Sequence, residues 1–139
     1  MAMHPKSSRL ISANFAFFKF FIVTMSKSTI TIGVKMDDNR VPESIEWTAS
    51  DTSSDNLQKA KAFMLSFWDG AEKTALRIDL WTKDMMVDEM GDFFYQTFKM
   101  MADTFDRATH QEELVGDIKQ FAEMFRKKFQ AIQLKDSKA

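Results

Sequence analysis

Residues 75–107, ALRIDLWTKDMMVDEMGDFFYQTFKMMADTFDR, decide the fold of this chain. Leu76, Ile78 and Leu80 alternate with polar residues, a pattern that is typical of a strand with one buried face. Apolar residues then recur every three or four positions, as one stripe of a long helix does: Val87, Met90, Phe94, Phe98, Met101 and Phe105. Because the pattern changes from strand to helix within a few residues, we expect a sheet and helices in one α+β domain.

Two strands are predicted before this stretch. Residues 28–36 and 44–50 each alternate between apolar and polar positions, and the turn-forming run Asp37-Asp38-Asn39 lies between them. We therefore expect an antiparallel hairpin. The residues on its shared apolar face are Ile30, Ile32, Val34, Met36, Ile45, Trp47 and Ala49.

A helix is predicted between that hairpin and a third strand at residues 74–82. Ser54 or Asp55 would cap its start, and Gly70 would lie just past its end. Its apolar side would carry Leu57, Ala60, Met64, Phe67 and Trp68.

Two long helices close the chain. The first is expected from about Val87 to Arg107, and the second opens with Thr109 and Glu112, which have the spacing of a capping box. The link between the two helices, from Ala108 to His110, is short enough to force an antiparallel helical hairpin. The second helix should bury Leu114, Ile118, Phe121, Phe125, Phe129 and Ile132. The predicted order is β-β-α-β-α-α, a two-layer sandwich in which helices cover a small, mainly antiparallel sheet.

The two ends of the chain differ from its middle. Residues 1–24 join Lys6 and Arg9 to an apolar run, which imitates a signal peptide, although Lys19 interrupts the run. We interpret this leader as a gene-start artefact, with Met25 as the true start. The domain is then residues 25–133, residues 134–139 are a frayed tail, and the location is cytoplasmic. The alternative is an exported or membrane-associated form.

Composition argues against several classes of function. The net charge is −1 and the pI about 6.1, whereas a nucleic-acid-binding protein needs a basic surface. The chain has no cysteine and two histidines, His4 and His110, so zinc sites and activated nucleophiles lack their usual residues. We expect no enzymatic activity, no catalytic or metal site, no cofactor, no nucleic-acid partner and no integral membrane span.

Two alternatives remain open. Asp84, Asp88 and Asp92 lie near the start of the long helix, where they could serve a carboxylate-based, metal-dependent enzyme. Acidic residues in a first turn also complement the helix dipole, which is the commoner explanation. A small-ligand-binding module would instead need a cavity between sheet and helices, beside Trp47 and Met64.

Three residues are candidates for contact with a partner. Trp81 lies on the strand face opposite Leu76 and Ile78, where solvent is expected, and Trp is enriched at binding hot spots. Phe93 and Met100 leave the main apolar stripe of the long helix, one heptad apart. Either other parts of the chain cover these three side chains, or they form a surface for a protein partner or for self-association.

Several word-like strings make the chain resemble the gliding motility protein GldC family of the Bacteroidetes. They are LRIDLWTKDM, VDEM, FF-x-QT and MADTF-x-RAT, together with VPESIEWTASD at 41–51 and KAFMLSFWD at 61–69, and the resemblance extends over most of residues 27–131. The chain departs from the family pattern at Met86, where Pro is expected, and at Gly91, where a helix former is more usual. The resemblance implies an accessory protein of gliding motility with protein partners in the motility apparatus and without a known reaction.

Overall fold

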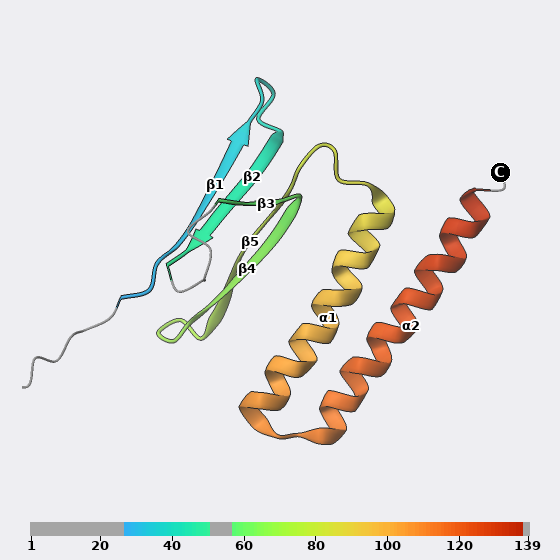
Figure 1. Ribbon diagram of the computed structural model, residues 1–139. Coiled ribbons are helices and arrows are strands. Elements are labelled where there is room, and N and C mark those ends of the chain that lie inside the picture. The colour runs from blue at the N-terminus through green and yellow to red at the C-terminus, as the bar shows by residue number, and fades with distance from the viewer. Residues whose placement is uncertain (1–26, 51–56, 138–139) are drawn as a thin grey trace, which may run out of the picture.

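The structure is a computed structural model that describes residues 27–50 and 57–137 (Figure 1). Residues 1–24 and the predicted caps Ser54 and Asp55 lie outside the described residues. Strands form one side of the molecule and a helical hairpin forms the other, which confirms the α+β class.

The described residues form seven elements. The first three strands form an antiparallel sheet in the order β1-β2-β3: β1 (Ile30–Met36), β2 (Pro42–Ala49) and β3 (Gln58–Ala60). A second antiparallel sheet consists of β4 (Ala62–Asp69) and β5 (Thr74–Trp81). The helices are α1 (Val87–Thr109) and α2 (Glu112–Asp136).

The first hairpin is confirmed. Ile32 pairs with Trp47 and Val34 pairs with Ile45, so the predicted apolar residues share one face. In the turn, the Asp37 carboxylate accepts backbone N–H groups of Asn39 at 2.9 Å and Val41 at 3.0 Å. An aspartate that bonds the backbone two residues on is a common way to stabilise such a turn.

The helix predicted over residues 57–69 is wrong, since this segment forms β3 and β4. Three of its apolar residues alternate and pair across the hairpin with those of the third strand: Phe63 with Leu80, Leu65 with Ile78, and Phe67 with Leu76. Gly70 lies in the hairpin turn, where the Asp69 carboxylate accepts the N–H of Ala71 at 2.9 Å. The apolar residues of this segment also fit a helical spacing, but their pairing across the hairpin stabilises the strand instead.

A bend at Lys61 separates the two sheets. The Lys61 carbonyl accepts the Thr82 N–H at 2.7 Å, and the Pro42 carbonyl accepts the Lys83 N–H at 2.9 Å. Among the described residues, Thr82 is the buried polar side chain, and its hydroxyl also donates to the Lys61 carbonyl. The end of β5 is thereby tied to both sheets.

The two helices form the predicted antiparallel hairpin. Aromatic rings line their contact: Phe98 lies 5.3 Å from Phe121 and 5.3 Å from Phe125, centroid to centroid. Thr109 belongs to the end of α1 and does not cap the second helix, which begins at Glu112. Residues 134–136, which we expected to fray, continue α2.

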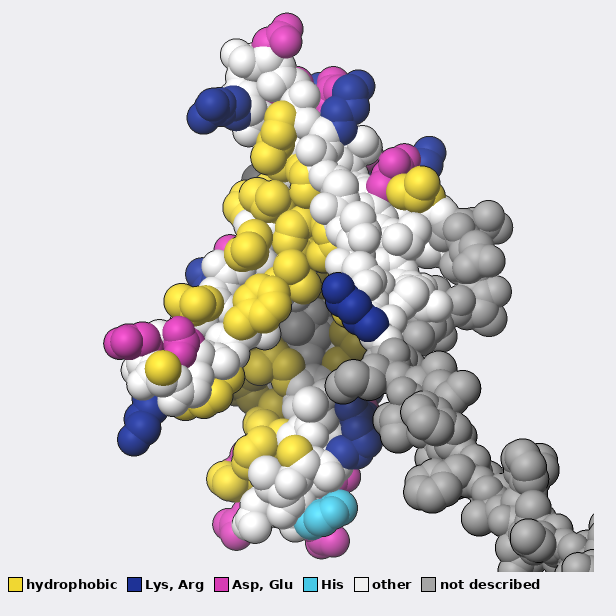
Figure 2. Space-filling view, turned by 90° about the vertical axis from the view of Figure 1, so that its left-hand side faces the viewer, with side chains coloured by type: hydrophobic (Ala, Val, Ile, Leu, Met, Phe, Trp, Pro, Cys, Tyr) yellow, Lys and Arg dark blue, Asp and Glu magenta, His cyan; other side chains and the backbone are white. Residues whose placement is uncertain are grey.

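The expected cover of the sheet by helices is largely missing. Packing occurs mainly within the sheets and within the helical hairpin. On β5, Leu76 and Ile78, which we predicted to be buried, expose 54% and 52% of their surface. Figure 2 shows hydrophobic side chains gathered in a band along the strand side of the molecule. In the described part of the chain, the buried hydrophobic residues are Ile45, Ala102, Val115 and Ala122.

Gly91 has a packing reason in this fold. It is buried in the second turn of α1, and a Cβ atom there would collide with the ring of Phe129 on α2. The absent side chain lets the two helices approach closely. The departure from the family pattern at this position therefore allows the ring of Phe129 to lie against the backbone of α1.

We predict that Gly91→Ala destabilises the protein by up to about 2 kcal/mol. Alanine improves helix propensity by about 1 kcal/mol, but overpacking against an aromatic ring costs roughly 1–3 kcal/mol. Gly116→Ala in α2 is the matched control: a Cβ atom added there would meet no other atom within 4 Å, so this substitution should stabilise. Urea denaturation at one protein concentration measures both, and a stabilising Gly91→Ala would contradict the close approach.

Phe125→Ala should cost more stability than Phe94→Ala. Each of these rings contacts three others, but Phe125 is half-buried whereas Phe94 is 36% exposed. We expect about 3 kcal/mol for Phe125→Ala, the lower end of the range for buried phenylalanine. Lys127→Ala is the surface control, expected within about 0.5 kcal/mol. Equal and small losses at both phenylalanines would show that the helix contact is placed wrongly.

Candidate contact surface

An open apolar groove lies where β5 leads into α1. Trp81 ends β5 and is 56% exposed, which agrees with its predicted place on the solvent side of the strand. The groove has a volume of about 480 Å³. We call it the Trp81 groove. Its lining residues are Trp81, Met85, Met86, Val87, Met90, Gly91, Phe94, Phe125 and Phe129.

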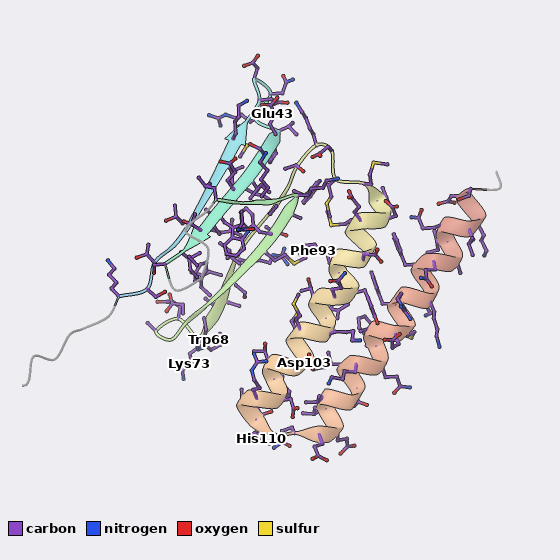
Figure 3. All side chains as sticks on the ribbon, viewed as in Figure 1. Glu43, Trp68, Lys73, Phe93, Asp103 and His110 are labelled. Carbon is purple, nitrogen blue, oxygen red and sulfur yellow. The ribbon has the colours of Figure 1, made fainter. Side chains whose placement is uncertain are left out.

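A smaller hollow of about 230 Å³ adjoins this groove between the β4–β5 hairpin and α1. Trp81, Met90 and Phe94 line both spaces, so the indole lies on the wall between them. Phe93 lines the smaller hollow from the side of α1 that faces the strands (Figure 3). The structure therefore brings two of the three predicted contact residues, Trp81 and Phe93, to one place.

Met100 lies elsewhere. It is exposed and lines a separate hollow of about 480 Å³ farther along α1, together with Met101, Phe105 and Ile118. Phe93 and Met100 share the strand-facing side of α1, as their heptad spacing requires, but they do not share a hollow. The three predicted contact residues thus form two sites.

Sequence reasoning missed the methionines of the Trp81 groove. Met85 and Met86 precede the first turn of α1, and Met90 follows one turn later. Methionine is flexible and polarizable, and it is frequent at surfaces that adapt to a partner. The signal was present in the repeated Met-Met at 85–86, next to an unburied tryptophan.

The acidic residues at the start of α1 bind lysine. Both carboxylate oxygens of Glu89 lie 2.9 Å from Lys61 Nζ, and Asp84 lies 3.8 Å from the same atom. Glu89 also accepts the Met86 N–H at 2.9 Å, a bond that proline at position 86 would lack. The Lys61 hydrogen bond, followed by that of Met86, lowers the pKa of Glu89, and the Glu89 hydrogen bond raises the pKa of Lys61.

The predicted pair Asp88 and Asp92 does not join this cluster. Both are exposed, and Asp88 accepts the backbone N–H of Glu89 at 2.9 Å, within the first turn of its own helix. Across residues 27–50 and 57–137, no three side chains of His, Asp or Glu come together in a way that could hold a metal ion. His110 ends α1 with a left-handed backbone, φ 54°, and thus occupies the expected helix link.

A second acidic cluster joins the ends of three strands. Lys35 and Lys83 each lie 2.9 Å from the Glu43 carboxylate, and their hydrogen bonds lower its pKa to about 2. Lys83 also lies 3.7 Å from Asp37. These groups are at the surface, and their opposite charges pair with one another, which is the arrangement of a structural cluster.

The ligand cavity proposed beside Trp47 and Met64 is not a single space. Met64 lines the hollow toward α1, whereas Trp47 lines a different hollow of about 230 Å³ on the opposite side of β4. Phe63 lines both hollows, and Leu65 lines the second one together with Trp47.

Of the helices in the described part, none is long and apolar enough to cross a membrane.

Comparison with known families assigns this chain. Neither curated proteins nor solved structures gave a match. A family model described as gliding motility-associated protein GldC-like matches residues 42–131, from the start of β2 to near the end of α2. The match confirms the resemblance seen in the sequence, and the chain belongs to the GldC-like family of gliding motility-associated proteins.

Proposed function

We propose that this protein is a non-enzymatic accessory component of gliding motility that acts by binding another protein in the Trp81 groove. The observation that carries the proposal is an indole that is more than half exposed on the wall of an apolar groove. Tryptophan is the residue most enriched at binding hot spots, and such anchors fill apolar pockets on a partner or are surrounded by them.

The shape of the groove favours a protein over a small molecule. Ligand sites enclose most of the surface of a bound compound, whereas this groove is open along its length. An amphipathic helix of a partner can lay its apolar side chains along an open groove without being enclosed by it. The methionines at positions 85, 86 and 90 can then repack around it.

The enzyme alternative has weaker support. Asp84 and Glu89 both pair with Lys61, and Asp88 and Asp92 are exposed in the first turns of α1. Carboxylates in this position complement the helix dipole without any role in a reaction.

We also propose that the protein works in the cytoplasm, in line with its cysteine-free composition. Fractionation of host cells, with detection of the native protein, tests this location against an exported or membrane-associated form.

Trp81→Ala should weaken partner binding and leave the fold nearly intact. The indole fills no core position, and loss of a hot spot costs 2 kcal/mol or more, roughly a 30-fold rise in Kd. Affinity purification from host lysate, with mass spectrometry of the captured motility components, measures the loss. A melting curve of the same variant checks the fold.

Trp68→Ala is the matched control. Trp68 is 69% exposed on the same face of the β4–β5 hairpin as Trp81, but it does not line the groove. Capture should survive this substitution. Equal loss with both variants, or unfolding of Trp81→Ala at growth temperature, would contradict a specific contact at Trp81.

The double variant Asp88→Asn, Asp92→Asn should retain motility. Asparagine keeps an acceptor oxygen for the Glu89 N–H and removes the charge that a metal or an acid–base step requires. Cell spreading on agar measures the result, together with a melting curve and the capture assay. Loss of motility with fold and capture intact would favour the carboxylate-based enzyme.

A further inference from the structure

The helical hairpin has one polar face and one apolar face. On the polar face, Lys119 pairs with Asp103 across the helices at 2.9 Å, and the Tyr95 hydroxyl donates to Glu123 at 2.6 Å. Arg126 lies over the Tyr95 ring at 4.8 Å. These contacts join α1 and α2 along one side of the hairpin and make that side the polar face.

The opposite face is apolar and exposed. By helical periodicity, six side chains lie on this side of the pair, and their exposed fractions run from 36% to 66%. We call them the heptad face: Val87, Phe94, Met101, Leu114, Phe121 and Ile132.

The spacing within this face is that of a helix bundle. Val87, Phe94 and Met101 follow one another at intervals of seven residues, and Leu114 and Phe121 do the same on α2. A repeat of seven keeps apolar side chains on one side of a helix that packs nearly parallel to another helix. In α1 this row runs beside the open hollow of about 480 Å³ that Met101 lines, which could receive side chains from a facing helix pair.

We propose that a second copy of this chain covers the heptad face, so that two helical hairpins form a four-helix bundle. Two-fold pairing makes the same patch serve both subunits, and helical hairpins commonly assemble in this way. With a net charge of −1 per chain, two copies repel each other little.

The exposed area suits a stable dimer. Side chains of this size that are about half exposed offer on the order of 80–100 Å² each. The six therefore supply roughly 500 Å², a large part of the ~800 Å² that each partner contributes to a standard interface. The flanking side chains and backbone supply the remainder.

A copy of the chain fits better than a transient partner, because so little of the described chain is buried. Its buried hydrophobic residues are three small side chains and Ile45. Obligate dimers complete a core that one chain lacks, and their partner is always present at equal concentration.

The test measures mass and thiol protection on the full chain. Light scattering of the wild type should give twice the 16.1 kDa of one chain, and dilution should lower the melting temperature. Because the chain has no native cysteine, single variants report one site each. Met101→Cys and Leu114→Cys should react with maleimide at least tenfold more slowly than Gln96→Cys, which lies on the polar side of α1.

A charged pair of substitutions gives the complementary result. Met101→Lys with Leu114→Lys should convert the dimer to a monomer, whereas Gln96→Lys on the polar side of α1 should leave the mass unchanged. If the lysine variant does not fold, the mass of the wild type and the cysteine protection still decide.

Three outcomes overturn the proposal. A wild-type monomer with reactive face cysteines would leave the face free, and a monomer with protected cysteines would assign its cover to the same chain. A dimer whose face cysteines react as fast as Gln96→Cys would place the interface on another surface. The mass and the maleimide reactivity are measured on the purified chain, so they can be interpreted even if the Trp81 capture assay fails.

Discussion

The arrangement of the whole molecule depends on the backbone at Lys61. Its carbonyl accepts the N–H and the hydroxyl of Thr82, and its ammonium binds Glu89 at the start of α1. Next to this point, the Lys83 N–H donates to the Pro42 carbonyl. Surface ion pairs contribute little to stability, about 0–1 kcal/mol. The hydrogen bonds around buried Thr82 therefore do most to hold the end of β5 against Lys61. They fix where β5 ends and thus where α1 begins.

This junction explains why the apolar surface is divided into separate grooves. The bend turns the β4–β5 hairpin away from the first sheet, and the helices meet the strands mainly near the start of α1. Each layer therefore keeps an apolar face that its own chain covers only in part. Burial of such faces supplies most of the free energy that opposes conformational entropy, so a partner surface has a direct effect on stability.

The sequence predicted the elements whose periodicity is long or unambiguous. Residues 74–82 and the two helices were recognised because alternation and a 3.6-residue stripe each extend over many positions. Residues 57–69 were assigned to a helix because Leu57, Ala60, Met64 and Phe67 fit a helical stripe. The same segment also alternates, and only its pairing partner across the hairpin decides between the two patterns. Local spacing cannot supply that partner.

The candidate site was predicted in part for the same reason. Strand parity placed Trp81 on the face opposite Leu76 and Ile78, because the side-chain period of a strand is two, although side chains on both faces of β5 are exposed. The methionines that complete the groove come from the loop and first turn that follow, and Phe129 comes from the far end of α2. An amphipathic pattern identifies an apolar stripe, but it does not say whether the same chain or another molecule covers that stripe. The heptad face is such a case.

The two surfaces meet at the first turns of α1, where Val87 and Phe94 belong to both. A second copy on the heptad face would fix these two side chains and add a wall to the Trp81 groove. Binding in the groove would then favour the dimer, and the dimer would favour binding by the same factor, because coupling between two sites is reciprocal. The close approach at Gly91 would support this coupling, since Phe129 packs against the backbone of α1 between the shared residues. A partner in the groove would therefore contact the same helix turns that a second copy would cover.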